Sequence, residues 1–250
     1  MQKVLIFLLL SLLYSNYNIA LCLKSIEEAV QGLFHDAIHA ADEKYFRGLR
    51  IVLGTFHESK RLKGVDSFLL RNYGPILWRS LRCANARVRA QATMLFFDAF
   101  PLQGSDASAV ESDVILQKQF DLLSSLLKDG DHRVRAAAAS GVCHILREYW
   151  EALPTQTTRQ ILSYVVGTLG HDSNCAVVRL AVVKGLGEVL DQPLSHSVLK
   201  SLLPLISDAL HDKSLAVRVA FIEILKKVTR VRISLLYSFA YSCAMLLSFL

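Results

Sequence analysis

Four segments of this 250-residue chain share one pattern, a Val-Arg pair that follows a polar turn and precedes small or apolar residues. The pairs are Val88-Arg89, Val134-Arg135, Val178-Arg179 and Val217-Arg218, and their valines lie 46, 44 and 39 residues apart. A period of about 40 to 47 residues is typical of repeats that consist of two helices. The chain is therefore predicted to fold as an all-α solenoid, in which helical hairpins stack into a superhelix.

The residues around the second Val-Arg pair show how one repeat is built. Phe120, Leu123, Leu126 and Leu127 share one helical face and lead into the polar turn at residues 129–131. The second helix is expected to begin at the Val-Arg pair, with an apolar stripe formed by Val134, Ala137, Ala138, Gly141, Val142 and Ile145. Its small residues allow neighbouring helices to approach closely. This arrangement is that of a HEAT or armadillo-like repeat.

Prolines and polar segments mark the expected connections. Pro75, Pro101, Pro154 and Pro193 are expected at helix starts or in connections, where a missing N–H costs little. Pro204 lies inside an apolar run and predicts a kinked first helix in the fourth repeat. Residues 103–113 form the longest polar stretch and predict the longest loop.

The composition supports a folded chain with a large core. Apolar residues make up 52% and charged residues 20%, which excludes disordered and collagen-like classes. The net charge of +6 is compatible with a polyanionic or acidic lipid partner without requiring one. The five cysteines contain no C-x-x-C pair, so we expect reduced thiols instead of a disulfide frame or a zinc site.

The two ends differ from the repeat region, which is expected to cover residues 24–232. Residues 1–23 are hydrophobic and fit either a signal peptide or a truncated helix of a HEAT repeat. Residues 233–250 carry no charge and follow several basic residues, as in a membrane span. The alternative hypothesis is that this tail is not native sequence.

The arginines of the repeats have two possible roles. As a structural ladder, arginines at the repeat position bind turn aspartates and hold neighbouring repeats in register; its members are Arg135, Arg179, Arg218, Asp129, Asp172 and Asp212. As a contact surface, basic residues face a phosphate backbone or a protein partner; these are Arg87, Arg89, Arg133, Lys226, Lys227, Arg230 and Arg232. The first repeat has Cys83 where the others have a turn aspartate, which favours its arginines for the second role.

No group of residues indicates catalysis. His35 and His39 lie four apart with Asp36 between them, which is close to a zinc-protease pattern but lacks its glutamate and a third ligand. Gly185-Leu186-Gly187 lacks the third glycine and the preceding strand of a dinucleotide-binding loop. We therefore expect no enzyme, metal, cofactor or small-molecule substrate. The aromatic residues, Trp78, Phe96, Phe97, Phe100, Tyr149 and Trp150, are expected in the core.

Several less common residues in a fixed order point to one family. They occur at residues 73–81, 99–101, 117–120, 149–151, 194–204 and 211–221. Over about residues 25–232 the chain resembles the G-type HEAT-repeat subunits of condensin II complexes. The resemblance implies a scaffold that binds the kleisin subunit and, through the complex, an SMC ATPase pair and a second HEAT subunit.

The resemblance also implies a role in mitosis. Such a subunit contacts chromosomal DNA without sequence preference, acts in chromosome condensation and segregation, and is located in the nucleus. The two hydrophobic ends support a different hypothesis, a secreted or membrane-anchored helical-repeat module that binds other proteins.

Overall fold

The computed structural model describes residues 19–60, 62–104 and 108–230, which form helices and turns with no strand among them. The expected all-α helical-repeat fold of the solenoid class is therefore confirmed. The chain divides into two compact units, residues 1–122 and 123–250, each of which is considered by itself.

The predicted terminal segments lie largely beyond the described residues. Residues 1–18 and the predicted tail 233–250 are outside them, and the first described helix already begins at Ile19. No helix among the described residues has both the length and the apolar character needed to cross a bilayer.

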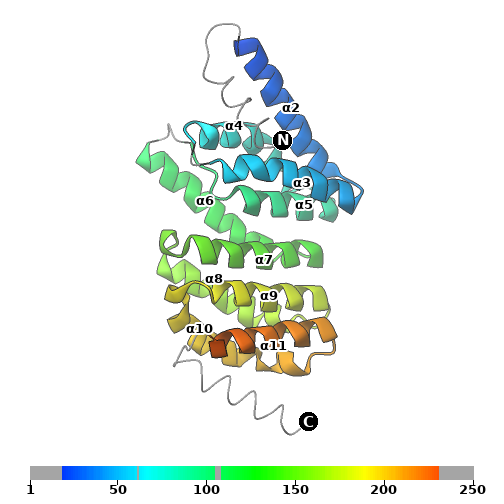
Figure 1. Ribbon diagram of the computed structural model, residues 1–250, viewed down its shortest axis with the longest axis vertical. Helices are drawn as coiled ribbons and strands as arrows, with labels where there is room; N and C mark the ends of the chain where they lie inside the picture. Colours follow the sequence, from blue (N-terminus) through cyan, green and yellow to red (C-terminus); the bar gives the residue numbers. More distant parts are fainter. Residues whose placement is uncertain (1–18, 61, 105–107, 231–250) are drawn as a thin grey trace. The chain divides into compact units, whose positions relative to one another are not determined.

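The described part of the first unit contains the helices α2 to α5 and most of α6 (Figure 1). They are α2 (Ile19–His39), α3 (Glu43–Glu58), α4 (Val65–Ser80), α5 (Ala86–Ala99) and α6 (Ala109–Leu127). The core of this unit is rich in aromatic rings. Phe34 of α2 stacks on Tyr73 of α4 with ring centroids 3.9 Å apart, and both side chains are fully buried. This stack joins two helices that are about 40 residues apart in sequence.

The expectation for the aromatic residues is correct for only half of them. Phe96, Phe97 and Phe100 are buried in the core. Trp78, Tyr149 and Trp150 are only partly buried. Trp78 is therefore available at a surface, with one neighbour ring at Phe96, 6.0 Å away between centroids.

A polar cluster is buried between α3, α4 and α5. His57 lies edge-on to Tyr73, with ring centroids 5.5 Å apart, and neither of its ring nitrogens has a hydrogen-bond partner among the described residues. Burial lowers the pKa of His57 to about 4, so the ring is neutral at physiological pH. Lys60 donates to the carbonyls of Ala99 and Pro101 at the end of α5, and burial lowers its pKa to about 8.

Two sequence expectations for this unit need correction. Pro75 lies inside α4 and not at a helix start. Its ring removes the hydrogen bond to the carbonyl of Arg71, but both residues are exposed, so water can satisfy that carbonyl. The predicted loop is shorter than expected, because α6 already begins at Ala109. Ser108 and Glu111 bond each other's backbone N–H groups there and form a capping box.

The second unit continues the repeats (Figure 1). Its α-helices after the end of α6 are α7 (His132–Glu148), α8 (Thr155–Gly167), α9 (Ala176–Val189), α10 (His196–Leu202) and α11 (Leu215–Arg230). Short 3-10 helices connect them, at η1 (Trp150–Ala152), η2 (Leu169–His171), η3 (Pro193–Ser195) and η4 (Leu203–His211). The second helices of successive repeats, α7, α9 and α11, lie in one row.

Pro204 has a larger effect than the expected kink. The first helix of the fourth repeat is α-helical only to Leu202 and continues as the 3-10 helix η4. Pro204 occupies the second position of η4, where its missing N–H is tolerated. The first helix of this repeat thus changes helix type at Leu203.

The helices α7 and α9 pack very closely. All six residues of the predicted stripe on α7 are buried, which confirms that part of the prediction. At Gly185 of α9, an added Cβ would lie 2.7 Å from both the Cβ and the Sγ of Cys143. Cys143 is a free thiol, and burial raises its pKa to about 12. The glycine is therefore required by the close approach of the two helices.

Candidate partner-binding surface

The helix that carries each Val-Arg pair starts in the same way. The four helices α5, α7, α9 and α11 all begin two residues before the valine, slightly earlier than expected. Side-chain oxygens accept hydrogen bonds from backbone N–H groups at or just before each start. Asn85 accepts from Arg87 and Val88 of α5, and Asp131 accepts from Arg133 of α7. Asp172 accepts from Asn174 and Cys175, and Asp212 accepts from Ser214, in the turns that precede α9 and α11. The first two are N-caps and fix where α5 and α7 start, whereas Cys175 at the start of α9 makes no side-chain cap.

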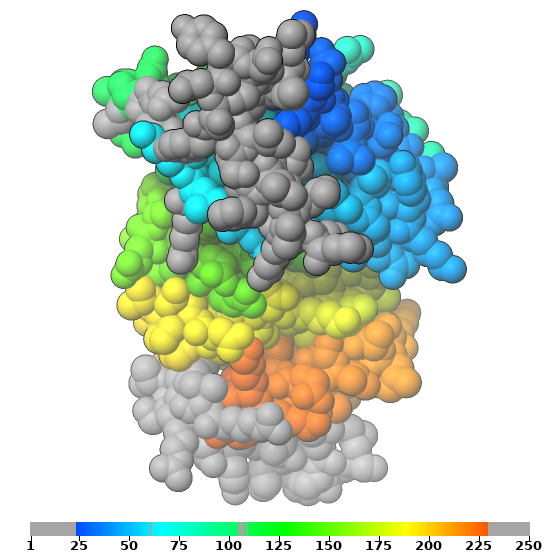
Figure 2. Space-filling model, turned by 45° about the horizontal axis from the view of Figure 1, so that its top comes forward, coloured from blue at the N-terminus to red at the C-terminus, as the bar shows by residue number. Residues whose placement is uncertain are grey.

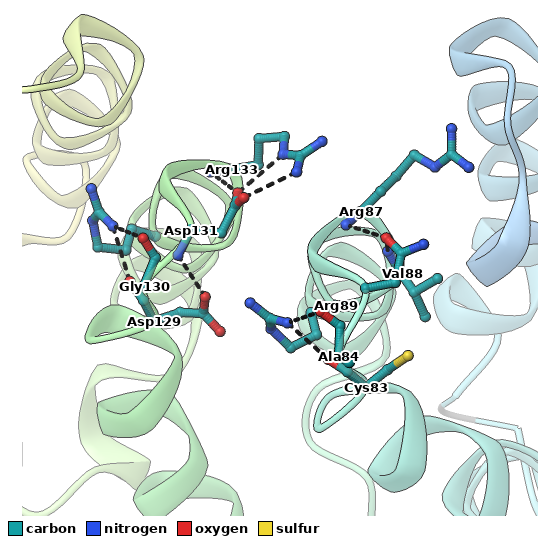
Figure 3. Close-up of polar contacts among 11 residues, drawn as sticks. Cys83, Ala84, Arg87, Val88, Arg89, Asp129, Gly130, Asp131 and Arg133 are labelled. Atoms are coloured by element: carbon teal, nitrogen blue, oxygen red, sulfur yellow. Dashed lines mark hydrogen bonds and ion pairs between the residues drawn. The ribbon is translucent and has the colours of Figure 1, made fainter.

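The arginine of every pair folds back onto its own turn. Arg89 donates to the carbonyls of Cys83 and Ala84 at 2.8 and 2.9 Å (Figure 3). The equivalent bonds join Arg135 to Asp129 and Gly130, Arg179 to Asp172, and Arg218 to Asp212 and Lys213. These carbonyls follow the end of the preceding helix and have no intrahelical donor. This role was not predicted, although the arginine stands six or seven residues after the turn carbonyl in every repeat.

Arg135 and Arg179 also reach the next repeat. Arg135 binds Asp172 at 2.8 Å, and Arg179 binds Asp212 through two bonds of 2.5 and 2.9 Å. The side chains of the second pair are only 15% and 8% exposed. The bond from Arg179 lowers the pKa of Asp212 against the opposing effect of burial. Burial would raise the pKa of Asp172, but Arg135 and two backbone N–H groups together lower it.

The arginines predicted to contact a partner differ in whether their guanidinium groups already bind other residues. The guanidinium of Arg87 is exposed, extends away from its turn, and lies 3.5 Å from the carbonyl of Ala41 (Figure 3). Arg89 is engaged by its turn, as described above. Arg133 is 51% exposed but pairs with its own Asp131, and that bond lowers the pKa of Asp131 to about 2.

The predicted lysines at the end of the second unit are also paired. Lys226 binds Glu223 at 2.7 Å on the same helix. Lys227 binds Asp191 at 2.7 Å and the carbonyl of Gly187, and so connects α11 with α9. The side chain of Arg230 and all of Arg232 lie outside the described part of the chain.

Both lysines line a groove between α9 and α11, which lie side by side in the row of second helices (Figures 1 and 2). The groove has a volume of about 1020 Å³. Its apolar lining includes Leu180, Val183, Leu215, Val219 and Ile224, and its charged lining consists of Lys184, Glu188, Glu223, Lys226 and Lys227. A groove with an apolar floor and with positive and negative side chains at its edges can bind an amphipathic peptide. The groove was not predicted from the sequence, because α9 and α11, which form its two walls, are some 35 residues apart in the chain.

The two histidines singled out by the sequence pattern lie on the same helix. His35 and His39 lie with ring centroids 4.4 Å apart on α2, and both are exposed. Within residues 19–60, 62–104 and 108–230, no group of three or more potential ligands is arranged to hold a metal ion.

Comparisons with known proteins show which family this chain resembles. The chain matches the model of the condensin II non structural maintenance of chromosomes subunit over residues 14–104. It is 41% identical to condensin-2 complex subunit G2 of Homo sapiens over 213 residues, or 84% of this chain and 19% of that protein. The proteins of the same name from Mus musculus and Xenopus laevis are 41% and 38% identical over 212 residues. The chain therefore spans about a fifth of the length of these relatives.

Proposed function

Because the chain belongs, over the residues that match, to the family of condensin II non-SMC subunits of the G2 kind, we propose that it serves as a non-catalytic scaffold in a condensin II complex. The observation that carries this proposal is the 41% identity over 84% of the chain. In this role it acts in the nucleus, on mitotic chromosomes, in their condensation and segregation. Its partners are then the kleisin subunit, an SMC ATPase pair and a second HEAT subunit.

The groove between α9 and α11 is the proposed binding site for a kleisin segment. Val219 is 49% exposed at this groove, so its side chain can be covered by a partner. Lys184 and Glu188 stand on α9 opposite Glu223 and Lys226 on α11, so a peptide of mixed charge can be matched on both sides. Apolar burial supplies the affinity in such a groove, and the charges set the register.

A substitution in the groove tests this site. Val219→Asp places a charge on the apolar floor and is expected to reduce the recovery of kleisin with the endogenously tagged protein at least fivefold. The matched control is Val177→Asp on α9, because Val177 is 57% exposed and does not line the groove. Quantitative mass spectrometry of the purified complexes measures both. Equal recovery with the two variants would exclude the groove, and absence of SMC ATPases from the wild-type sample would exclude the complex.

Sequence-independent DNA contact is the second part of the proposal. It is supported by the net charge of +6 and by the exposed guanidinium of Arg87, which has no carboxylate partner among the described residues. Arg133 and Lys226 add exposed positive charges that are partly neutralised by Asp131 and Glu223. Contacts of this kind bind phosphates and carry no sequence information.

The salt dependence of DNA binding tests this part. Arg87→Gln is expected to make the slope of log K against log salt concentration less steep by about 0.9, the value for one lost phosphate contact. Arg159→Gln, at an exposed arginine of α8, is the control and should leave the slope unchanged. Fluorescence anisotropy with duplexes of two unrelated sequences gives both numbers. A strong preference for one duplex, or an unchanged slope in Arg87→Gln, would contradict the proposal.

A further inference from the structure

The first unit contains a second concave site, which the family comparison does not explain. It lies between α2, α4 and the start of α5, and its volume is about 1140 Å³. The residues that matter for its chemistry are His35, His39, Ile76, Trp78, Arg79 and Arg82. All of them belong to the first unit, so the site is complete within it.

The permanently charged side chains that line this pocket are positive. Arg79 and Arg82 are exposed, and neither guanidinium has an ion pair or hydrogen bond among the described residues. Other arginines of this unit do have carboxylate partners, at Arg47–Glu43, Arg50–Asp98 and Arg71–Glu27. Among the described residues, no carboxylate lines the pocket; Asp36 is adjacent in sequence to the lining residue His35, and its Oδ1 lies 3.8 Å from Nδ1 of that histidine. Two permanent cations therefore face the pocket without a counter-charge from its lining.

Apolar side chains form part of the remaining lining, beside His35, His39, Ser80 and Cys83. Trp78 and Ile76 are partly exposed there, and Pro75 next to them is exposed. A partly exposed indole beside arginines favours a ligand with an apolar side chain close to a negative charge. A bare phosphate backbone has no such side chain, and its charges are spread along a line instead of meeting at one pocket.

We propose that this pocket binds a short acidic peptide, in which carboxylates pair with Arg79 and Arg82 and a neighbouring apolar side chain packs on Trp78 and Ile76. The site goes beyond the proposed scaffold function, since it uses neither the α9–α11 groove nor the DNA-contact residue Arg87. Arginine is suited to this task because its planar fork binds a carboxylate through two parallel bonds.

Binding of a defined probe tests the proposal. The probe is a fluorescein-labelled peptide Glu-Asp-Leu-Glu-Glu, titrated with the full chain and followed by fluorescence polarisation. The double variant Arg79→Gln/Arg82→Gln is expected to bind at least tenfold more weakly, whereas Arg159→Gln should bind within twofold of wild type. Replacing the leucine of the probe by serine should weaken binding severalfold. Raising the salt concentration from 50 to 300 mM should weaken it as well, because the paired charges are exposed.

Several outcomes would overturn the proposal. Unchanged binding by the double variant would remove the two arginines from the site. Unchanged binding of the serine probe would remove the apolar contact. A probe with phosphoserine in place of its first glutamate that binds when the carboxylate probe does not would assign the pocket to phosphopeptides. Full displacement of the probe by a 20-base-pair duplex would assign it to DNA. Circular dichroism of each variant confirms that its fold is intact.

Discussion

Replacing Arg179 by methionine is expected to lower the free energy of unfolding of the second unit by about 3 kcal/mol, because the loss of one partner leaves a buried charge uncompensated. The guanidinium makes two bonds to Asp212 and one to the carbonyl of Asp172, so three acceptor atoms lose their donor together. Methionine keeps most of the length of the side chain, which limits the cavity that the substitution creates.

The matched control is Arg133→Met. Arg133 also pairs with an aspartate, but its side chain is 51% exposed and the pair lies within a single turn. Exposed pairs contribute about 0 to 1 kcal/mol, so the control should lose no more than that. Urea unfolding at pH 7 gives both values. Similar losses in the two variants would show that the bond between repeats adds nothing to the turn contacts.

Acid provides a second measurement of the same pair. The pKa of Asp212 is lower in the folded chain than in the unfolded chain. The ionised Asp212 carboxylate therefore makes its full contribution to the free energy of unfolding above the unfolded pKa of about 3.9. This contribution is lost as the pH falls through the folded pKa. The difference in stability between wild type and Arg179→Met should therefore shrink below about pH 3.9. A difference that stays constant to pH 2 would contradict the assignment of the stabilisation to this pair.

Replacing Gly185 by alanine is expected to destabilise the second unit by about 3 kcal/mol, the upper end of the usual cost of overpacking. The new Cβ would lie 2.7 Å from the Cβ and Sγ of Cys143, a separation that requires α7 and α9 to move apart. Urea unfolding monitored by circular dichroism measures the loss. Cys143→Gly in the Gly185→Ala background removes both contacted atoms and should recover part of it.

The control for this prediction lies two residues further along the same helix. A Cβ at Gly187 would lie 3.6 Å from Cγ1 of Ile224, which is an ordinary contact distance. Gly187→Ala should therefore be neutral or stabilise the helix by about 0.5 to 1 kcal/mol, because alanine loses less backbone entropy. Equal destabilisation by both substitutions would contradict crowding at Cys143 as the cause of the loss.

The sequence predicts those features that depend on neighbouring residues. The Val-Arg pairs and polar turns were enough to locate the second helix of each repeat to within two residues, because caps and helical periodicity are local. The buried stripe of α7 follows from the same periodicity. The capping box at Ser108 and Glu111 was also readable from its spacing, although the sequence analysis assigned these residues to a loop.

The sequence does not predict grooves and pockets whose walls come from helices that are far apart in the chain. The groove at Val219 and the pocket at Trp78 each depend on side chains from helices that meet only in the folded chain. Likewise, a list of charged residues cannot show that Lys227 is engaged by Asp191 while Arg79 has no acidic partner in the described part of its unit. Whether a basic residue can serve a partner depends on such pairings, which the charge of the residue alone does not reveal.

The hydrogen bonds from each repeat arginine to its own turn determine where the repeat can change in length. The arginine reaches back six, six, seven and six residues in the four repeats, whereas successive valines are 46, 44 and 39 residues apart. An insertion between the turn and the arginine would break these hydrogen bonds. Length changes are therefore confined to the first helix of each repeat and to the connection between one repeat and the next. We therefore expect evolutionary insertions and deletions in such chains at one end of each hairpin, and engineered tags should be placed at that end.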